Sequence, residues 1–157
     1  MIPPAATSSS LHLLFRLQHD LYAIEAAQIK VVLRRPALKQ CPAAPHWVAG
    51  LLHYQGSTVP VLDLYQRLLQ REAGWQTSTR LVLVHYKQQL LGLLLEQVHR
   101  FERLTDQLWQ DSRLLLPDHQ YLGQVQQHEG LGLIQQVRLA DLLPVDVQQV
   151  LFPPAQR

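Results

Sequence analysis

The 157-residue sequence is poor in cysteine and in charge. Its single cysteine, Cys41, cannot form an intramolecular disulfide, which favours a reducing compartment such as the cytoplasm. Charged residues make up only 17% of the chain, which is below the level of ordinary globular proteins. The net charge is +2, and Lys and Arg never cluster beyond a pair, so a nucleic-acid-binding surface is not indicated. A surface with little charge is cheap to desolvate and suits a protein that packs against other proteins.

The sequence also lacks long hydrophobic runs. No segment approaches the roughly 18 apolar residues that a membrane-spanning helix needs. The apolar stretch 11–17 is short, follows no basic region and contains His12 and Arg16, so it does not resemble a secretory signal. Hydrophobic residues still make up 47% of the chain, enough for a full core. We therefore expect a folded protein without direct membrane insertion.

Short apolar segments bounded by turn residues predict a mainly β structure. Four hairpins are expected, from the segments 13–17 with 21–24, 49–54 with 58–63, 80–86 with 90–95, and 121–127 with 131–137. A further strand is expected over 28–33, and short helices over 64–69 and 139–143. The segment 34–46 holds three prolines and should be a loop. Pro60 predicts that its strand lies at an edge or is irregular.

The two halves of the chain repeat the same order of elements: a hairpin, an apolar strand, a hairpin opened by glycine, and a helix. This indicates a duplicated unit. Two pairs of matching residues, Ala23 with Gly92 and Ile29 with Val98, are each 69 residues apart. Glycines also match, Gly50 with Gly123 at the start of a hairpin and Gly56 with Gly130 at its turn.

The duplication predicts an all-β fold of two small, SH3-like β-barrels packed side by side. A unit of about 65 residues is marginal alone, so the barrels should share an apolar seam, and closure would remove their exposed strand edges. The predicted boundaries are a flexible tail over 1–10, a first barrel over 11–70, a linker over 71–79, a second barrel over 80–144, and a C-terminal helix or tail over 145–157.

Several short motifs, in this order and spacing, resemble the CheW-type adaptors of bacterial chemosensory arrays. The resemblance covers about residues 13–143, and its motifs are YAI at 22–24, PHWVAG at 45–50, HYQG at 53–56, VPVLDL at 59–64, RLVLV at 80–84, GLLLE at 92–96 and YLG at 121–123. It implies two five-stranded barrels around a hydrophobic interface and a scaffold that is not an enzyme. The implied partners are the cytoplasmic tip of a methyl-accepting chemoreceptor, the regulatory domain of a CheA-type histidine kinase, and other CheW-like proteins. The implied location is the cytoplasm, recruited to membrane-associated receptor arrays.

The resemblance also implies which residues face the receptor. Ile29 and Val98 would line the seam between the barrels, where the receptor groove of the family lies, and both full burial and groove exposure are open for them. The kinase is expected at an end of one barrel. The receptor-binding residues implied in this way are Ile29, Val31, Gly50, Gln55, Gly56, Gly92 and Val98.

One motif departs from the family. The usual tetrapeptide Asn-Leu-Arg-Gly is His53-Tyr54-Gln55-Gly56 here, and the acidic residue that can pair with the arginine is replaced by Val31. Losing both partners together is physically consistent, because an unpartnered buried charge costs several kcal/mol. The sequence is in this respect similar to adaptors of alternative systems, such as the surface-sensing Wsp type.

Two alternatives stay open from the residues alone. A β-barrel enzyme or small-molecule-binding protein would need a deep pocket with convergent polar groups. A nucleic-acid-binding barrel would need aromatic residues interleaved with Lys and Arg on one face, whereas Trp47, Trp75 and Trp109 are scattered.

The eight histidines show no metal-binding spacing and Ser57 lies in no nucleophile motif, so we expect no catalysis, metal or cofactor. For His53 a structural role beside a turn is favoured over ligand binding.

Three residues have predicted structural roles. Asp63 ends a strand directly before the helix 64–69 and is well placed as its N-cap. Gly50 is expected where two backbone segments approach closely, and Gly56 where a turn requires a positive φ.

Overall fold

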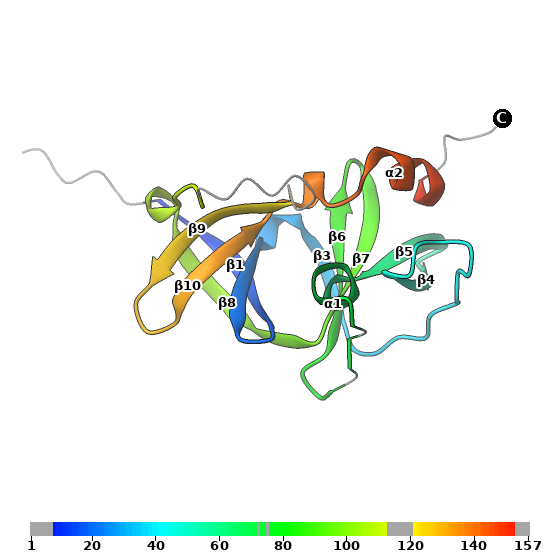
Figure 1. Ribbon diagram of the computed structural model, residues 1–157, viewed down its shortest axis with the longest axis horizontal. Helices are drawn as coiled ribbons and strands as arrows, with labels where there is room; N and C mark the ends of the chain where they lie inside the picture. The colour runs from blue at the N-terminus through cyan, green and yellow to red at the C-terminus, as the bar shows by residue number, and fades with distance from the viewer. Residues whose placement is uncertain (1–7, 72, 75, 113–120, 153–157) are drawn as a thin grey trace, which may run out of the picture.

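The computed structural model describes residues 8–71, 73–74, 76–112 and 121–152. Within these residues ten strands form two five-stranded sheets, which lie side by side in Figure 1. We call them the β1 barrel and the β6 barrel. The β1 barrel has the order β8-β1-β2-β10-β9 and contains β1 (Ser9–Leu17), β2 (Asp20–Glu25), β8 (Gln97–Thr105), β9 (Leu122–His128) and β10 (Gly132–Val137). The β6 barrel has the order β3-β6-β7-β5-β4 and contains β3 (Ile29–Leu33), β4 (Val48–Tyr54), β5 (Ser57–Asp63), β6 (Arg80–Tyr86) and β7 (Gln89–Leu95).

A short bridge between the edge strands closes each sheet. In the β6 barrel, the segment after β3 pairs with β4: Lys39 N donates to Leu51 O at 2.8 Å, and Leu51 N donates to Lys39 O at 2.7 Å. In the β1 barrel, the segment after β8 pairs with β9 through two hydrogen bonds of 2.8 Å between Gln110 and Val125. Closure leaves fewer exposed strand edges. The predicted all-β fold of two small five-stranded barrels is confirmed.

The predicted assignment of residues 11–70 to one barrel and 80–144 to the other is wrong. Each barrel combines the first hairpin of one half with the last three strands of the other half. The reason lies in the connection from β2 to β3, which is the three-residue 3-10 turn Ala26–Gln28. If β3 stayed in the barrel of β1 and β2, it would pair antiparallel with β1 and would therefore run parallel to β2. A connection between two parallel strands needs about a dozen residues or more, and only three are present. The chain therefore continues into the neighbouring barrel.

The register of the strands confirms the duplication. Val98 in β8 lies opposite Phe15, and its counterpart Ile29 in β3 lies opposite Val84. Both pairings contain a bulge next to this point, between Leu14 and Phe15 in one and between Ile29 and Val31 in the other. The 69-residue spacing read from the sequence thus corresponds to equivalent places in the two barrels.

The helices are short. The predicted helix over 64–69 is confirmed as α1 (Leu64–Leu69), whereas the segment 139–143 forms only a 3-10 turn over Leu139–Asp141. The predicted C-terminal helix is α2 (Val145–Leu151), and residues 153–157 lie outside the described part. The predicted N-terminal tail extends too far, because β1 already begins at Ser9; residues 1–7 are not described.

Pro60 lies in β5, between β4 and β7, and not in an edge strand. The pairing of β5 with β7 covers only Val61 to Asp63, so at Pro60 the strand is paired on one side alone. The missing N–H of proline is therefore not needed at this position.

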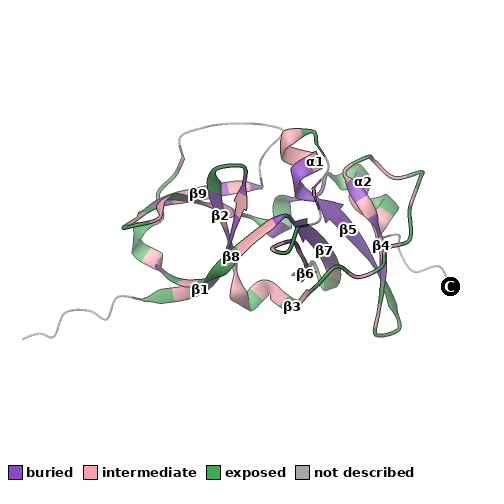
Figure 2. Ribbon diagram, turned by 90° about the horizontal axis from the view of Figure 1, so that it is seen from below, coloured by how far each residue is buried: buried purple, intermediate pink, exposed green. Residues whose placement is uncertain are grey.

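The apolar core has three parts. The largest, which we call the seam, lies between the barrels and joins β1 residues such as Phe15 to β6 and β7 residues such as Val84 and Leu93. A second cluster fills the β6 barrel and a third fills the β1 barrel. Figure 2 shows β5 and β7 as buried strands, whereas β8 is largely intermediate or exposed. The predicted apolar seam is confirmed.

Candidate protein-binding site

Ile29 and Val98 lie at the border of the seam. Each packs against the seam cluster and is only partly buried. Because their registers are equivalent, the two halves of the chain present an aliphatic side chain at the same place on either side of the seam. Of the two possibilities that the sequence left open, full burial is excluded. These side chains therefore carry the apolar seam to the surface of the molecule.

Val31 and the strand β4 both contribute to the apolar interior of the β6 barrel. Val31 and Tyr54, the residue before Gln55, both pack against the interior cluster of the β6 barrel. Gln55 and Gly56 are exposed and have φ values of 47° and 80°, as the two central residues of a tight hairpin turn require. The predicted positive φ of Gly56 is confirmed.

Gly50 and Gly92 are buried and serve the packing of the backbone. At Gly50, with a φ of 151°, an added Cβ would lie 2.6 Å from Lys39 O, so the bridge that closes the β6 barrel requires glycine. At Gly92 an added Cβ would lie 2.8 Å from Val61 Cγ2 inside the same barrel. The predicted close approach at Gly50 is confirmed. The expectation that these two glycines offer contact surface is corrected, because neither is exposed.

Asp63 is the N-cap of α1, as predicted. Its Oδ1 accepts hydrogen bonds from Tyr65 N at 3.0 Å and from Gln66 N at 3.1 Å. Its Oδ2 accepts from Ala73 N at 2.8 Å, so the same carboxylate also fastens the chain that follows the helix.

The buried carboxylate of Glu96 holds the described residues of the predicted linker 71–79 in place. Glu96 Oε2 accepts from Arg71 Nη1 and from Gly74 N, both at 2.9 Å, and Glu96 Oε1 accepts from Gln76 Nε2 at 3.2 Å. The single hydroxyl hydrogen of Thr79 is within reach of two acceptors, Gly74 O at 2.7 Å and Glu96 O at 3.0 Å. Burial raises the pKa of the Glu96 carboxyl, but the hydrogen bonds from Arg71 and Gly74 outweigh this and hold the pKa below its ordinary value. Sequence reasoning missed this network, whose members are scattered through the sequence.

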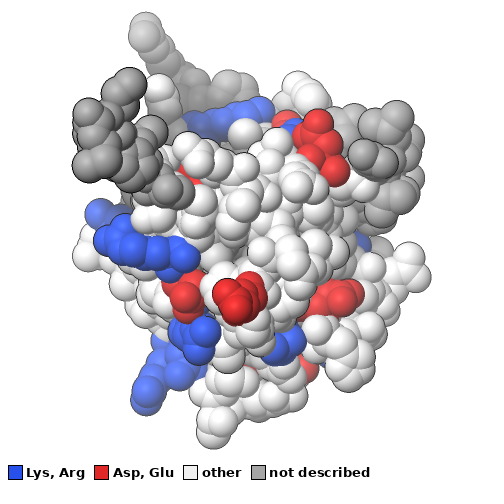
Figure 3. All heavy atoms as spheres, turned by 90° about the vertical axis from the view of Figure 1, so that its left-hand side faces the viewer, with Lys and Arg blue, Asp and Glu red and all other residues white. Residues whose placement is uncertain are grey.

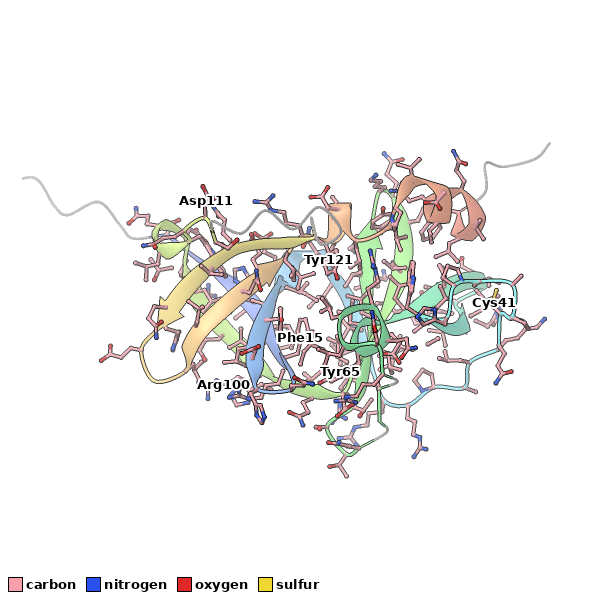
Figure 4. All side chains as sticks on the ribbon, viewed as in Figure 1. Phe15, Cys41, Tyr65, Arg100, Asp111 and Tyr121 are labelled. Carbon is pink, nitrogen blue, oxygen red and sulfur yellow. The ribbon has the colours of Figure 1, made fainter. Side chains whose placement is uncertain are left out.

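Arg67 of α1 connects the two barrels. Its guanidinium lies 5.2 Å from the ring centre of Trp47, which precedes β4, and 5.3 Å from that of Tyr121, which precedes β9. Burial raises the pKa of Tyr121 to about 12, although the charge of Arg67 opposes this. Figure 4 shows Phe15, Tyr65 and Tyr121 in the middle of the molecule, where the barrels meet. No sequence signal singled out Arg67.

The structure also places the histidines and acidic residues that the sequence analysis considered as ligands. Among them, no three His, Cys, Asp or Glu side chains are grouped so that they could hold a metal ion. His53 is exposed and lies opposite Thr58 beside the turn. No helix in the described part of the chain has both the length and the apolar character to cross a membrane.

The family model for the CheW-like domain matches residues 11–143. The chain belongs to the CheW-like family. Among curated proteins it is 23% identical over 104 residues to the chemotaxis protein CheW of Treponema pallidum, a match covering 63% of this chain and 61% of that protein. It is also 23% identical over 87 residues to chemotaxis protein CheW of Bacillus subtilis, which covers 55% and 56% of the two chains. The matches thus span only about three fifths of the length of these CheW relatives.

A solved CheW structure has the same fold. The scaffolding protein TtCheW from Thermoanaerobacter tengcongensis superimposes with a TM-score of 0.80 at 19% identity, over 89% of this chain and 96% of that one. The resemblance inferred from the short motifs is therefore confirmed at the level of family and fold.

Proposed function

We propose that this CheW-like chain is a non-catalytic adaptor that couples the cytoplasmic tip of a methyl-accepting chemoreceptor to a CheA-type histidine kinase. The observation that carries the proposal is the pair Ile29 and Val98, two equivalent aliphatic side chains that extend the seam between the barrels and stay partly exposed. An apolar site of this kind suits a helical partner, whose own apolar stripe would cover it.

The receptor face in this proposal runs from the seam onto the β6 barrel. Ile29 and Val98 supply the apolar anchors, and Val31, Gln55 and Gly56 continue the surface along β3 and the turn after β4. Gly50 and Gly92 act underneath, by allowing the backbone packing that places these strands.

The kinase would use a different surface. The β1 barrel exposes Leu108 at 50% and Leu133 at 58%. The side of the molecule formed by the β1 barrel also carries a broad uncharged area with charged residues scattered around it (Figure 3). The regulatory domain of the kinase, which is built on the same barrel fold in this family, would pair with such a barrel surface, and so would other CheW-like proteins.

The proposed setting is the cytoplasm, with recruitment to membrane-associated receptor arrays through the receptor. The paired replacement of arginine by Gln55 and of an acidic residue by Val31 supports an alternative array, such as a surface-sensing Wsp-type system. No cofactor or metal takes part in this function, so a chelator should leave the melting temperature unchanged.

Co-purification tests the proposal. The tagged chain, expressed in its own host and cross-linked before lysis, should recover a methyl-accepting receptor and a CheA-type kinase together. The double variant Ile29→Asp and Val98→Asp should lose the receptor, whereas Val150→Asp, which changes an exposed valine of α2, should keep it. Recovery of neither protein by the folded wild-type chain would contradict the proposal.

A further inference from the structure

A cavity of about 370 Å³ opens at one end of the β6 barrel. Its floor is made by Val59 and Leu90. Its rim is made by Lys30, His85, Ser57 and Thr58, together with Gln88 of the turn after β6 and Gln89 at the start of β7. Val59 belongs to the interior cluster of the barrel and Leu90 packs against it. The cavity is therefore the mouth of the β6 barrel.

The alternation of side chains along β6 explains why His85 lies on this rim. Leu81 and Leu83 point into the barrel interior, while Val82 and Val84 face the seam. His85 follows on the interior side, at the end of the strand, where the barrel opens. Lys30 reaches the same rim from the bulge in β3, where the pairing with β6 passes from Ile29 directly to Val31.

The mouth is lined by unengaged donors and by no carboxylate. Within the described residues, the side chains of Lys30 and His85 take part in no hydrogen bond or ion pair, and the side chains of Ser57 and Thr58 likewise make no hydrogen bond. The matching residue in the β1 barrel differs: Arg16, 69 residues before His85, donates to His19 O at 3.1 Å. Positive charge and hydroxyl groups above an apolar floor complement a carboxylate carried on an aliphatic stem.

We propose that the mouth of the β6 barrel receives an acidic side chain from the chemoreceptor tip. The inference rests on the proposed function and adds a charge contact to it. The receptor is the favoured source because Lys30 lies between Ile29 and Val31, and Ser57 directly follows Gln55 and Gly56, so residues of the proposed receptor face flank the cavity.

The test is titration of the chain with the cytoplasmic-tip hairpin of a methyl-accepting receptor from the same host, at low and at high salt. Lys30→Gln and His85→Gln together should weaken binding about fivefold at low salt and reduce its salt dependence. Lys30→Arg should retain wild-type binding. Lys39→Gln removes the same charge from an exposed position of the same barrel outside the cavity, and it should change little. Replacing the responsible receptor Asp or Glu by its amide should have no further effect in the double variant.

The outcomes separate this inference from the proposed function. If the wild-type chain binds the receptor hairpin and the double variant binds equally well, the mouth does not hold an acidic side chain and the adaptor role stands. If the double variant instead weakens binding of the kinase regulatory domain by the same factor, the assignment to the receptor is overturned. If the wild-type chain does not bind the hairpin at all, the proposed function falls, and the inference with it.

Discussion

The two barrels share one topology but have different interiors. In the β6 barrel the buried residues of the interior cluster are all aliphatic. His12 of the β1 barrel corresponds to Leu81 of the β6 barrel. His12 lies three residues before Phe15, and Leu81 lies three residues before Val84, which matches Phe15 in register. Gln126 of the β1 barrel likewise corresponds to Leu52 of the β6 barrel. Gln126 follows Val125 and Leu52 follows Leu51, and these two residues form the bridges that close the barrels. Both polar residues are at most 3% exposed.

The polar interior of the β1 barrel is only partly satisfied. Gln126 Nε2 donates to Thr105 O at 3.2 Å, and His12 Nδ1 lies 3.0 Å from Ser10 O. The Nε2 atom of His12 is buried without a hydrogen-bond partner, and its ring lies 5.6 Å from that of Trp109. A buried polar atom without a partner costs about 1–3 kcal/mol. The topology is therefore maintained by strand pairing and by the seam, while each interior can diverge.

Exchanging the matched interior residues should have the largest effect. Leu81→His places a polar ring in the aliphatic interior and should lower the free energy of unfolding by about 3–5 kcal/mol. The reciprocal substitution His12→Leu removes the buried Nε2 atom that has no partner, and it should raise the free energy of unfolding by about 1 kcal/mol. Urea denaturation measures both. Equal destabilisation by the two substitutions would contradict the claim that the buried ring of His12 is a cost at a position where the β6 barrel has an aliphatic residue.

Glu96→Gln should lower the free energy of unfolding by about 1–3 kcal/mol at pH 7, because the charge-assisted bonds from Arg71 weaken. The direction in which this stabilisation changes with pH follows from the lowered pKa of Glu96. The stabilisation is present above the ordinary value of 4.5 and is lost as pH falls through the lower pKa of the folded state. Thermal unfolding of both proteins from pH 7 to acid should show the difference shrinking below about pH 4.5. A difference that is constant over this range would contradict the role of the Glu96 charge.

The helix caps offer a second comparison between the halves. Asp63 N donates to Trp47 O at 2.8 Å and Arg138 N donates to Tyr121 O at 2.6 Å, so the two residues occupy matching places. Asp63 caps a six-residue α-helix, whereas the side chain of Arg138 has no hydrogen-bond acceptor and Arg138 precedes a three-residue 3-10 turn. Asp63→Ala should cost about 1–2 kcal/mol in unfolding free energy, and Arg138→Asp should add about 0.5 kcal/mol. Destabilisation by Arg138→Asp in denaturant titrations would show that the places are not equivalent.

A small effect is also expected from the coupling between positions 31 and 55. Val31→Glu should weaken receptor binding because it places an unpaired carboxylate beside the apolar interior of the β6 barrel. Adding Gln55→Arg should recover part of the loss, with a coupling free energy of about 0.5–1 kcal/mol. Titration of the four variants against the receptor hairpin measures this. Strictly additive effects would mean that the two side chains do not meet.

The sequence predicted the elements and the matched positions better than the assembly. Alternating apolar residues and turn glycines indicate strands locally, and the 69-residue spacing located the equivalent registers of Ile29 and Val98. Which hairpin joins which barrel depends on pairing partners far apart in the chain, and no local pattern carries that information. Most of β8 was missed because QVHRFERLT has little apolar alternation and its residues are mostly exposed or half-buried.

The candidate site was predicted in a similar way. Residues with a local signature, such as the N-cap Asp63 and the turn glycine Gly56, have the structural roles expected of them. Gly50 and Gly92 match the family motifs, but their burial shows that they act through packing. Contacts between distant residues, such as Arg67 with Trp47 and Tyr121, leave no pattern in a single sequence.

The central claim is that the matched positions Ile29 and Val98 anchor the receptor, while the kinase binds elsewhere. Affinities of the wild-type chain, Ile29→Asp and Val98→Asp for the receptor hairpin and for the kinase regulatory domain test it most directly, with circular dichroism to establish that each variant is folded. Each substitution removes an apolar anchor worth about 1.5–3 kcal/mol on burial. We predict a loss of at least about tenfold for the receptor in both variants, with kinase binding nearly unchanged. An equal loss of both partners in folded variants would contradict the account.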